Sequence, residues 1–144
     1  MRILTLILVA AAVMALRPAP AAAQGYVVVV NSANPVSSVT PDQLGRFFRK
    51  QIVRWDNGTE VVPIDLAENS AVRERFSQAV MGRSTSAMKA WWQRQIFSGR
   101  GVPPVEKASD SEVLAMVRST PGAIGYVSAG AALGAGVKAV QVAG

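Results

Sequence analysis

Residues 121–127, Pro-Gly-Ala-Ile-Gly-Tyr-Val, are the stretch that decides the fold. Proline lacks the backbone N–H that a helix needs, so Pro121 ends a preceding helix and Gly122 supplies the turn after it. The next five residues are apolar and predict a short buried strand, in which Gly125 lets another backbone or side chain approach closely. The end of the helix, the turn and the strand therefore follow one another directly, which is typical of an α/β layer architecture.

The rest of the chain extends this alternation of helices and strands. Val27 to Val30 is an unbroken run of β-branched residues, which predicts a central parallel strand that is covered on both faces. Further strands are expected at 61–64, around 105, at 123–127 and at 137–142, and helices are expected to begin after the capping residues Thr40, Ser70, Ser84 and Ser109. The predicted fold class is α/β: a single domain with a mainly parallel sheet flanked by helices.

The helix that begins after Ser70 has a clear apolar face. Val72, Phe76 and Val80 recur four residues apart, so this side is expected to face the core. The charged residues beside them, Arg73 among them, are expected to point outward.

Two local features carry narrower expectations. Pro63 cannot donate a backbone hydrogen bond, which argues against a mid-sheet position for strand 61–64 or for a bulge in it. Trp91 and Trp92 lie on one broad helical stripe, so at least one ring is expected in the core. A stacking platform for a sugar or a base is the alternative role of this pair.

The first 23 residues have the layout of a secretory signal peptide. Arg2 precedes the apolar stretch 3–16, and three alanines end at Ala23, where cleavage is expected. The stretch is shorter than the roughly 20 residues of a membrane-crossing helix, so no membrane span is expected after signal cleavage. The expected organisation is a signal peptide at 1–23 and one domain at 24–144, located in the periplasm or secreted.

Composition excludes several kinds of chemistry. The chain has no His and no Cys, which rules out Ser-His and Cys-His nucleophilic catalysis, the usual zinc ligand sets and disulfides. Residues 24–144 carry a net charge of +4, compatible with an anionic ligand, an acidic envelope surface or simple solubility. The basic residues form no long cluster, so nucleic acid is not an expected partner. A binder without metal or cofactor is expected rather than an enzyme; a hydrolase that uses Asp65 or Glu68 is the remaining enzymatic alternative.

Nearly the whole chain after the signal segment resembles one lobe, the second, of phosphate-type ABC-transporter substrate-binding proteins, which have the type 2 periplasmic binding protein fold. The resemblance rests on Val27 to Asn31, the helix of residues 40–48, the turn Trp55-Asp56-x-Gly58, the helix start at 70–76 and, most specifically, residues 121–127. It implies a receptor of two lobes that closes on an oxyanion and delivers it to a membrane transporter. Because 121 residues make only one lobe, a single-lobe short form is expected.

The family's phosphate-gripping segment is only partly present. That segment has the pattern R-x-D-G-S-G-T, and residues 66–72 stand at the matching positions. Ser70 is kept, whereas Leu66 and Val72 replace the Arg and the Thr. The chain thus lacks a guanidinium that would form two hydrogen bonds with phosphate and a hydroxyl that would donate another. The affinity for phosphate should therefore fall by orders of magnitude. A helix N-terminus remains, with Ser70 as a donor and Arg73 one turn further, an arrangement that still favours an anion.

Two functions follow from these residues. The first is an exported substrate-binding-protein-like module that takes phosphate or another small anion or polar ligand for an ABC transporter. Its candidate ligand-binding residues lie in loops at the carboxyl ends of strands: Asn31, Ser32, Asn69, Ser70 and Arg73, together with the start of the Ser84 helix. The second is an envelope accessory protein that keeps the lobe scaffold without phosphate binding and contacts another envelope protein or a second copy of itself. In that case Asn69 or Ser70 only caps its helix and Arg73 is solvated.

Overall fold

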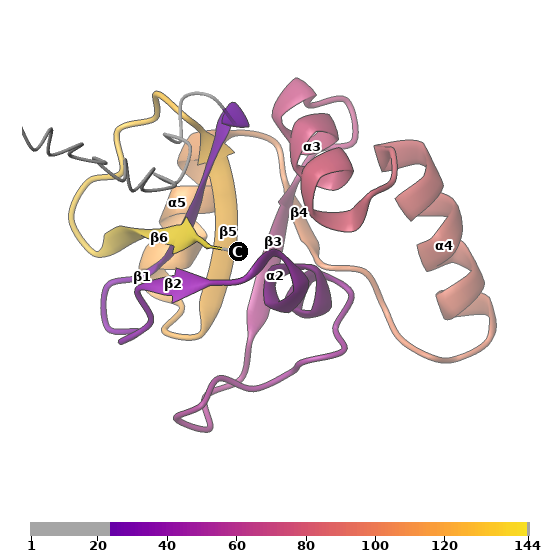
Figure 1. Cartoon of the computed structure of the whole chain (residues 1–144), viewed down its shortest axis with the longest axis horizontal. Helices are drawn as coiled ribbons and strands as arrows, with labels where there is room; N and C mark the ends of the chain where they lie inside the picture. Colours follow the sequence, from indigo (N-terminus) through magenta and orange to yellow (C-terminus); the bar gives the residue numbers. More distant parts are fainter. Residues whose placement is uncertain (1–23, 144) are drawn as a thin grey trace, which may run out of the picture.

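One six-stranded sheet with helices on both faces organises the protein (Figure 1), so the predicted α/β class is confirmed. The computed structural model describes residues 24–143; the expected signal peptide lies outside them. The strands are β1 (Tyr26–Asn31), β2 (Ser38–Val39), β3 (Val62–Leu66), β4 (Val105–Lys107), β5 (Ala123–Ser128) and β6 (Val137–Val142). The helices are α2 (Pro41–Phe48), α3 (Ala71–Phe76), the π-helical η1 (Ser77–Met81), α4 (Thr85–Phe97) and α5 (Asp110–Ser119).

The sheet has the order β2-β6-β1-β5-β3-β4 and is mainly parallel. The exception is β1, which is central and buried as predicted but runs antiparallel to both of its neighbours, β5 and β6. The prediction of a parallel first strand is therefore wrong. A run of valines that is buried on both faces looks the same in either direction, so the local pattern carries no signal for strand direction.

Strand β3 has neighbours on both sides, β5 and β4, so the argument from Pro63 against a mid-sheet position is wrong. The ladder nevertheless accommodates the proline. Val62 donates its N–H to the Gly122 carbonyl on the β5 side, at 3.0 Å. Pairing with β4 begins only at Ile64, opposite Val105, so Pro63 precedes the β4 ladder and its missing donor is not needed there.

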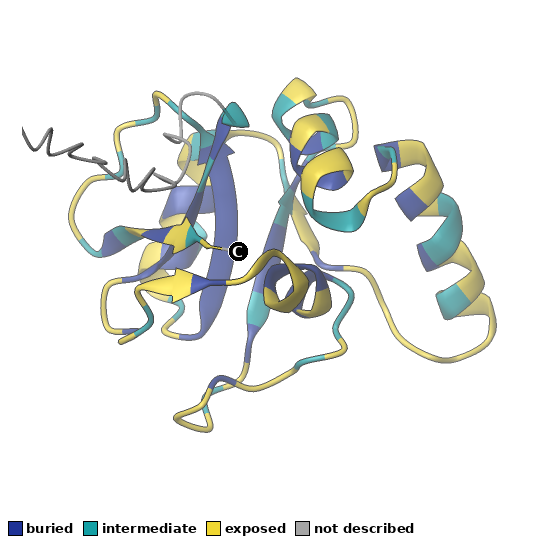
Figure 2. Cartoon of the chain, in the orientation of Figure 1, coloured by how far each residue is buried: buried dark blue, intermediate teal, exposed yellow. Residues whose placement is uncertain are grey.

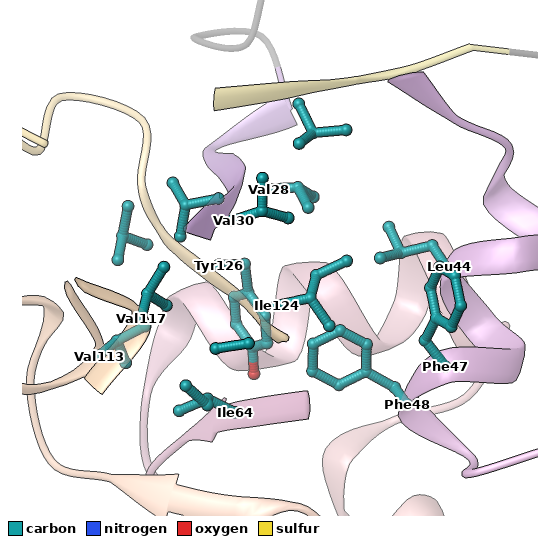
Figure 3. Packing of buried hydrophobic residues seen from close by; sticks show 14 of the residues in the cluster. Val28, Val30, Leu44, Phe47, Phe48, Ile64, Val113, Val117, Ile124 and Tyr126 are labelled. Atoms are coloured by element: carbon teal, nitrogen blue, oxygen red, sulfur yellow. The ribbon is translucent and has the colours of Figure 1, made fainter. Parts of the chain in front are cut away.

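Helix α5 covers one face of the sheet. A side chain at Gly125 would place its Cβ 2.9 Å from Val113 Cγ1, so only glycine lets α5 pack this close to β5. The close approach expected at Gly125 is thus confirmed. Figure 3 shows Val113 and Val117 of α5 together on one side of β5.

Helices α2 and α3 cover the opposite face through an aromatic cluster. Tyr126 of β5 stacks on Phe76 with ring centroids 3.8 Å apart, and Phe48 meets Phe76 edge to face at 4.8 Å. Figure 3 shows the Tyr126 hydroxyl and the Phe48 ring on this side of the core. The cluster fixes α2 and α3 on the sheet and places the Tyr126 hydroxyl beside the end of β3.

Helix α4 lies outside these layers and packs mainly on η1 (Figure 1). It buries Met88 and Trp92, each 6% exposed, so the prediction that at least one tryptophan is buried is confirmed. Trp91 is only half-buried. Exposed residues cover much of α4, whereas β5 is buried almost throughout (Figure 2).

Candidate functional site

The carboxyl end of β3 leads through the loop 67–70 into α3, where the sequence predicts the anion site. The Ser70 hydroxyl accepts the N–H of Arg73 at 3.2 Å, so it caps the helix. Asn69 is exposed in the loop. Glu68, which stands where the resembling family has Asp, makes an ion pair with Lys89 at 2.9 Å.

Arg73 turns into the protein, and the prediction that it points outward is wrong: the residue is only 7% exposed. Its Nη1 donates to the Leu66 carbonyl at 2.9 Å and to Glu106 Oε1 at 2.5 Å, while Nη2 lies 3.7 Å from Asp65 Oδ2. The spacing of residues 73, 76 and 80 contains the missed signal, because Arg73 shares a helix face with Phe76. Two carboxylates on neighbouring strands make its burial tolerable.

Tyr126 completes this charge cluster, which consists of Asp65, Arg73, Tyr126 and Glu106; of these, Glu106 alone has an exposed side chain. The Tyr126 hydroxyl donates to Asp65 Oδ1 and accepts the Leu66 N–H at 3.3 Å. Burial raises the pKa of Asp65, and the Arg73 charge and the Tyr126 hydrogen bond offset only part of that shift. Burial and the nearby Asp65 charge raise the pKa of Tyr126.

The cluster is electrostatically unsuited to an anion. With both carboxylates ionised, Asp65 and Glu106 outweigh the single guanidinium of Arg73, and the hydrogen bonds of Arg73 are already directed inward. A phosphate at the start of α3 would have to compete with these partners and approach two carboxylates.

Asn31 and Ser32 follow the carboxyl end of β1, and this end lies on the opposite side of the sheet from the carboxyl end of β3, where Asn69 and Ser70 follow. The reason is that β1 runs antiparallel to β5 while β3 runs parallel to it. The Asn31 amide donates at 3.0 Å to the carbonyls of Val117 and Arg118, at the end of α5, so it serves that helix end. Ser32 is exposed. The structure therefore brings Asn69, Ser70 and Arg73 together and separates them from Asn31 and Ser32.

Sequence reasoning missed a cleft of about 250 Å³ between α2, η1 and α4. It is lined by Arg49, Gln51, Met81, Arg83, Met88 and Trp91. Nothing local links Arg49 to Arg83, because the two residues come together through the packing of α2 on η1.

Residues 24–143 contain neither a group of metal ligands nor a membrane-spanning helix. No group of three or more Asp, Glu, His or Cys side chains is placed there to hold a metal ion. In the same range no helix is both long enough and apolar enough to cross a membrane.

A mainly parallel sheet with one reversed central strand and helices on both faces places this chain in the α/β class. Its sequence matches the model of the PBP superfamily domain over residues 10–143. The chain therefore belongs to the periplasmic binding protein superfamily, and its structure resembles part of that fold.

Solved structures agree with this assignment. An ABC-type phosphate transport receptor from Vibrio cholerae is 25% identical with a TM-score of 0.64, over 82% of this chain and 46% of the receptor. PstS from Borrelia burgdorferi is 17% identical with a TM-score of 0.58, over 82% of this chain and 47% of PstS, and supports the fold alone. The chain thus spans less than half the length of either protein. No curated protein matches the sequence.

Proposed function

We propose that the protein is an exported binding-protein-like module that docks on another envelope protein and does not grip phosphate at the start of α3. The observation that carries the proposal is the inward position of Arg73, whose guanidinium is held by Leu66, Glu106 and Asp65. An arginine used in this way cannot also present its fork to a phosphate in solution.

The segment from the last turn of α4 to β4 supports a docking role. Phe97 is 97% exposed, and Ile96 and Val102 are 50% and 61% exposed. Met88 and Trp92, earlier in the same helix, are buried, so the apolar residues extend along the chain beyond the part of α4 that the protein covers. Exposed apolar side chains that lie close together in the chain are typical of a surface that a partner covers.

Charge indicates the chemistry of that partner. Arg94 and Arg100 flank the exposed residues, and neither makes an ion pair within residues 24–143. Two copies of this surface would bring like charges together, which disfavours self-association through it. The partner that fits is a protein with an apolar socket and an acidic rim.

Photo-crosslinking in living cells tests the docking surface. A photoreactive residue in place of Phe97 should give one adduct of discrete mass, different from the mass of a dimer. The same residue in place of Val53, which is 54% exposed elsewhere on the surface, is the matched control and should give none. Arg94→Glu together with Arg100→Glu should abolish the adduct. Equal labelling at both positions, or an adduct that survives charge reversal, contradicts the proposal.

A second candidate function is capture of phosphate or another small anion at Asn69 and Ser70 for an ABC transporter. The likeness to the Vibrio cholerae phosphate transport receptor favours it. Calorimetry separates the two candidates. Docking without phosphate capture predicts no saturable heat up to about 1 mM phosphate or sulfate. Saturable heat that Ser70→Ala removes would establish anion capture instead.

Export has its own test. Mass spectrometry of protein from the periplasm or the culture medium should find a chain that begins at Gln24. A chain in the cytoplasm that retains Met1 contradicts export.

A further inference from the structure

We infer that the cleft between α2, η1 and α4 binds a small aromatic anion, a single ring that carries one carboxylate or phosphate group. The cleft is lined by Arg49, Gln51, Met81, Arg83, Met88 and Trp91. Two cations and an aromatic wall in one hollow carry this inference, which is independent of the docking surface proposed for α4.

The two arginines supply unneutralised positive charge. Neither Arg49 nor Arg83 makes an ion pair within the part of the chain that the structure describes. Arg49 contacts only neutral acceptors, Met81 Sδ at 3.5 Å and Gln51 Oε1 at 3.4 Å, and these long contacts orient the guanidinium without cancelling its charge. The loop that carries Arg83 is fixed because the Ser77 hydroxyl donates to the Arg83 carbonyl at 2.6 Å. Guanidinium groups form forked, charge-assisted hydrogen bonds with carboxylates and phosphates.

The other wall of the cleft is apolar and aromatic. Met81 and Met88 contribute polarizable thioethers, which make favourable contacts with aromatic rings. Trp91 is half-buried and packs edge to face on the buried Trp92, with centroids 4.7 Å apart and planes at 79°. A ligand ring can pack on this indole. Inorganic phosphate would lose water on the side that faces this wall and gain no hydrogen bond there in return. An anion with an attached ring fits the cleft better, because its ring can contact the wall.

Size and local dipoles limit the ligand further. A cleft of about 250 Å³ lies below the range of roughly 300 to 1,000 Å³ of drug-sized sites, so a single ring is the appropriate scale. Helix α2 ends at Phe48 and η1 ends at Met81, so two carbonyl ends lie near the arginines and reduce the positive potential. One anionic group, a carboxylate or a phosphate, therefore suits the cleft better than several.

The cleft is separate from the start of α3. Helix α3 continues directly into η1, so Ala71 and Met81 lie at opposite ends of one helical segment, about 15 Å apart. Met81 and Met88 also line the small internal space next to Asp65 and Arg73. These two side chains thus lie between the cleft and the carboxylate of Asp65.

Binding of matched probes to the purified protein tests the inference. Benzoate and phenyl phosphate should each give a saturable change in tryptophan fluorescence and in calorimetric heat. Benzamide has the ring without the charge, and inorganic phosphate has the charge without the ring. Each of these controls should bind at least about tenfold more weakly, because each loses one half of the site. Equal affinity of benzoate and benzamide would overturn the inference.

Variants place the binding in the cleft. Arg83→Gln and Arg49→Gln should each weaken benzoate at least about tenfold, and Trp91→Leu should weaken both ring anions. Arg54→Gln is the matched control, because Arg54 is exposed outside the cleft and donates only to the Gly58 carbonyl. Equal loss in the Arg83 and Arg54 variants refutes the site. If Arg49→Gln disturbs folding, the exposed Arg83 decides the test alone. Crosslinking at Phe97 is unaffected by either result.

Discussion

At the scale of single residues, Asp65 gives the protein a pH-dependent stability. Burial holds its folded-state pKa above the ordinary carboxyl value of about 4. The folded chain therefore binds this proton more tightly than the unfolded chain, and stability falls as pH rises from about 4 through the folded-state pKa. Two partners of Asp65, Arg73 and Tyr126, limit the fall without reversing it.

The prediction is a free energy of unfolding that declines above pH 4 by at most about 1.4 kcal/mol per pH unit, and a weaker decline in Asp65→Asn. Urea titrations between pH 4 and 8 measure both proteins. Glu74 has a lowered pKa, from hydrogen bonds with Thr85 and Gln78, and acts with the opposite sign. Since both proteins contain Glu74, the difference between them isolates Asp65. Parallel pH profiles would contradict the assignment.

Gly122 is the residue of the 121–127 stretch that tolerates a side chain least. A Cβ there would lie 1.8 Å from the Glu60 carbonyl oxygen, a backbone atom that cannot move without opening the β3–β5 ladder. Gly122→Ala should cost about 3 kcal/mol or more of the free energy of unfolding. Gly130→Ala, where no atom lies within 4 Å of the added Cβ, should stay within about 0.5 kcal/mol. Similar urea midpoints for the two variants would show that the clash relaxes.

Asn31 acts on the end of α5. Its amide donates to two carbonyls, those of Val117 and Arg118. Asn31→Asp replaces these donors by a negative charge at the negative end of the helix, so it should cost about 2 to 4 kcal/mol, more than Asn31→Ala. Thermal unfolding measures both variants. Equal Tm values for Asn31→Asp and the unchanged protein would remove Asn31 from this structural role.

At the scale of elements, local sequence predicted where most helices begin and which runs form strands. The Thr40 capping box is present with both of its hydrogen bonds, and Ser84 caps α4 as expected. The two-residue strand β2 and the π-helical η1 were missed. A two-residue strand is too short to show a hydrophobic period. The π-helical turn η1 differs from an α-helix in its hydrogen bonding, which the pattern of apolar residues does not reveal.

The candidate sites show the same division between local and non-local information. Asn69 and Ser70 were placed together because they are neighbours in the chain. The direction of β1, which separates Asn31 from them, depends on pairing between distant segments. The arginines of the cleft also meet only through packing of α2 on η1, which no local pattern encodes.

Helix α4 should tolerate changes on its outer side and not on its inner side. Trp92→Ala removes a buried ring and should cost about 3 to 5 kcal/mol, whereas Phe97→Ala removes an exposed one and should change the free energy of unfolding by less than about 0.5 kcal/mol. Urea unfolding followed by circular dichroism measures both. A large cost for Phe97→Ala would show that its ring is packed, and would withdraw the docking surface as well.

At the scale of the whole molecule, the two ends of the described chain meet in the centre of the sheet. Strand β1 comes first, and β6, the last strand, pairs with it along Val28 to Asn31 (Figure 1). Strand β6 also holds β2 on its other side. The sheet is therefore completed by pairing between segments that are far apart in the chain, β1 and β6. Folding of the lobe thus depends on residues 137–142, although these residues pack against few of the helices.

Removal of residues 137–144 should abolish the native fold. The deletion uncovers the edge of β1, in which Val28, Val29 and Val30 are buried, and leaves β2 without a partner. We expect an aggregating or molten product that binds a hydrophobic dye and has lost its near-ultraviolet circular dichroism. Removal of residues 143–144 alone, which keeps all of β6, is the matched control and should leave the melting transition within about 3 °C of that of the complete chain. A long truncation that still unfolds in one sharp transition would mean that β1, β5 and β3 with their helices suffice, and that β6 only covers an edge.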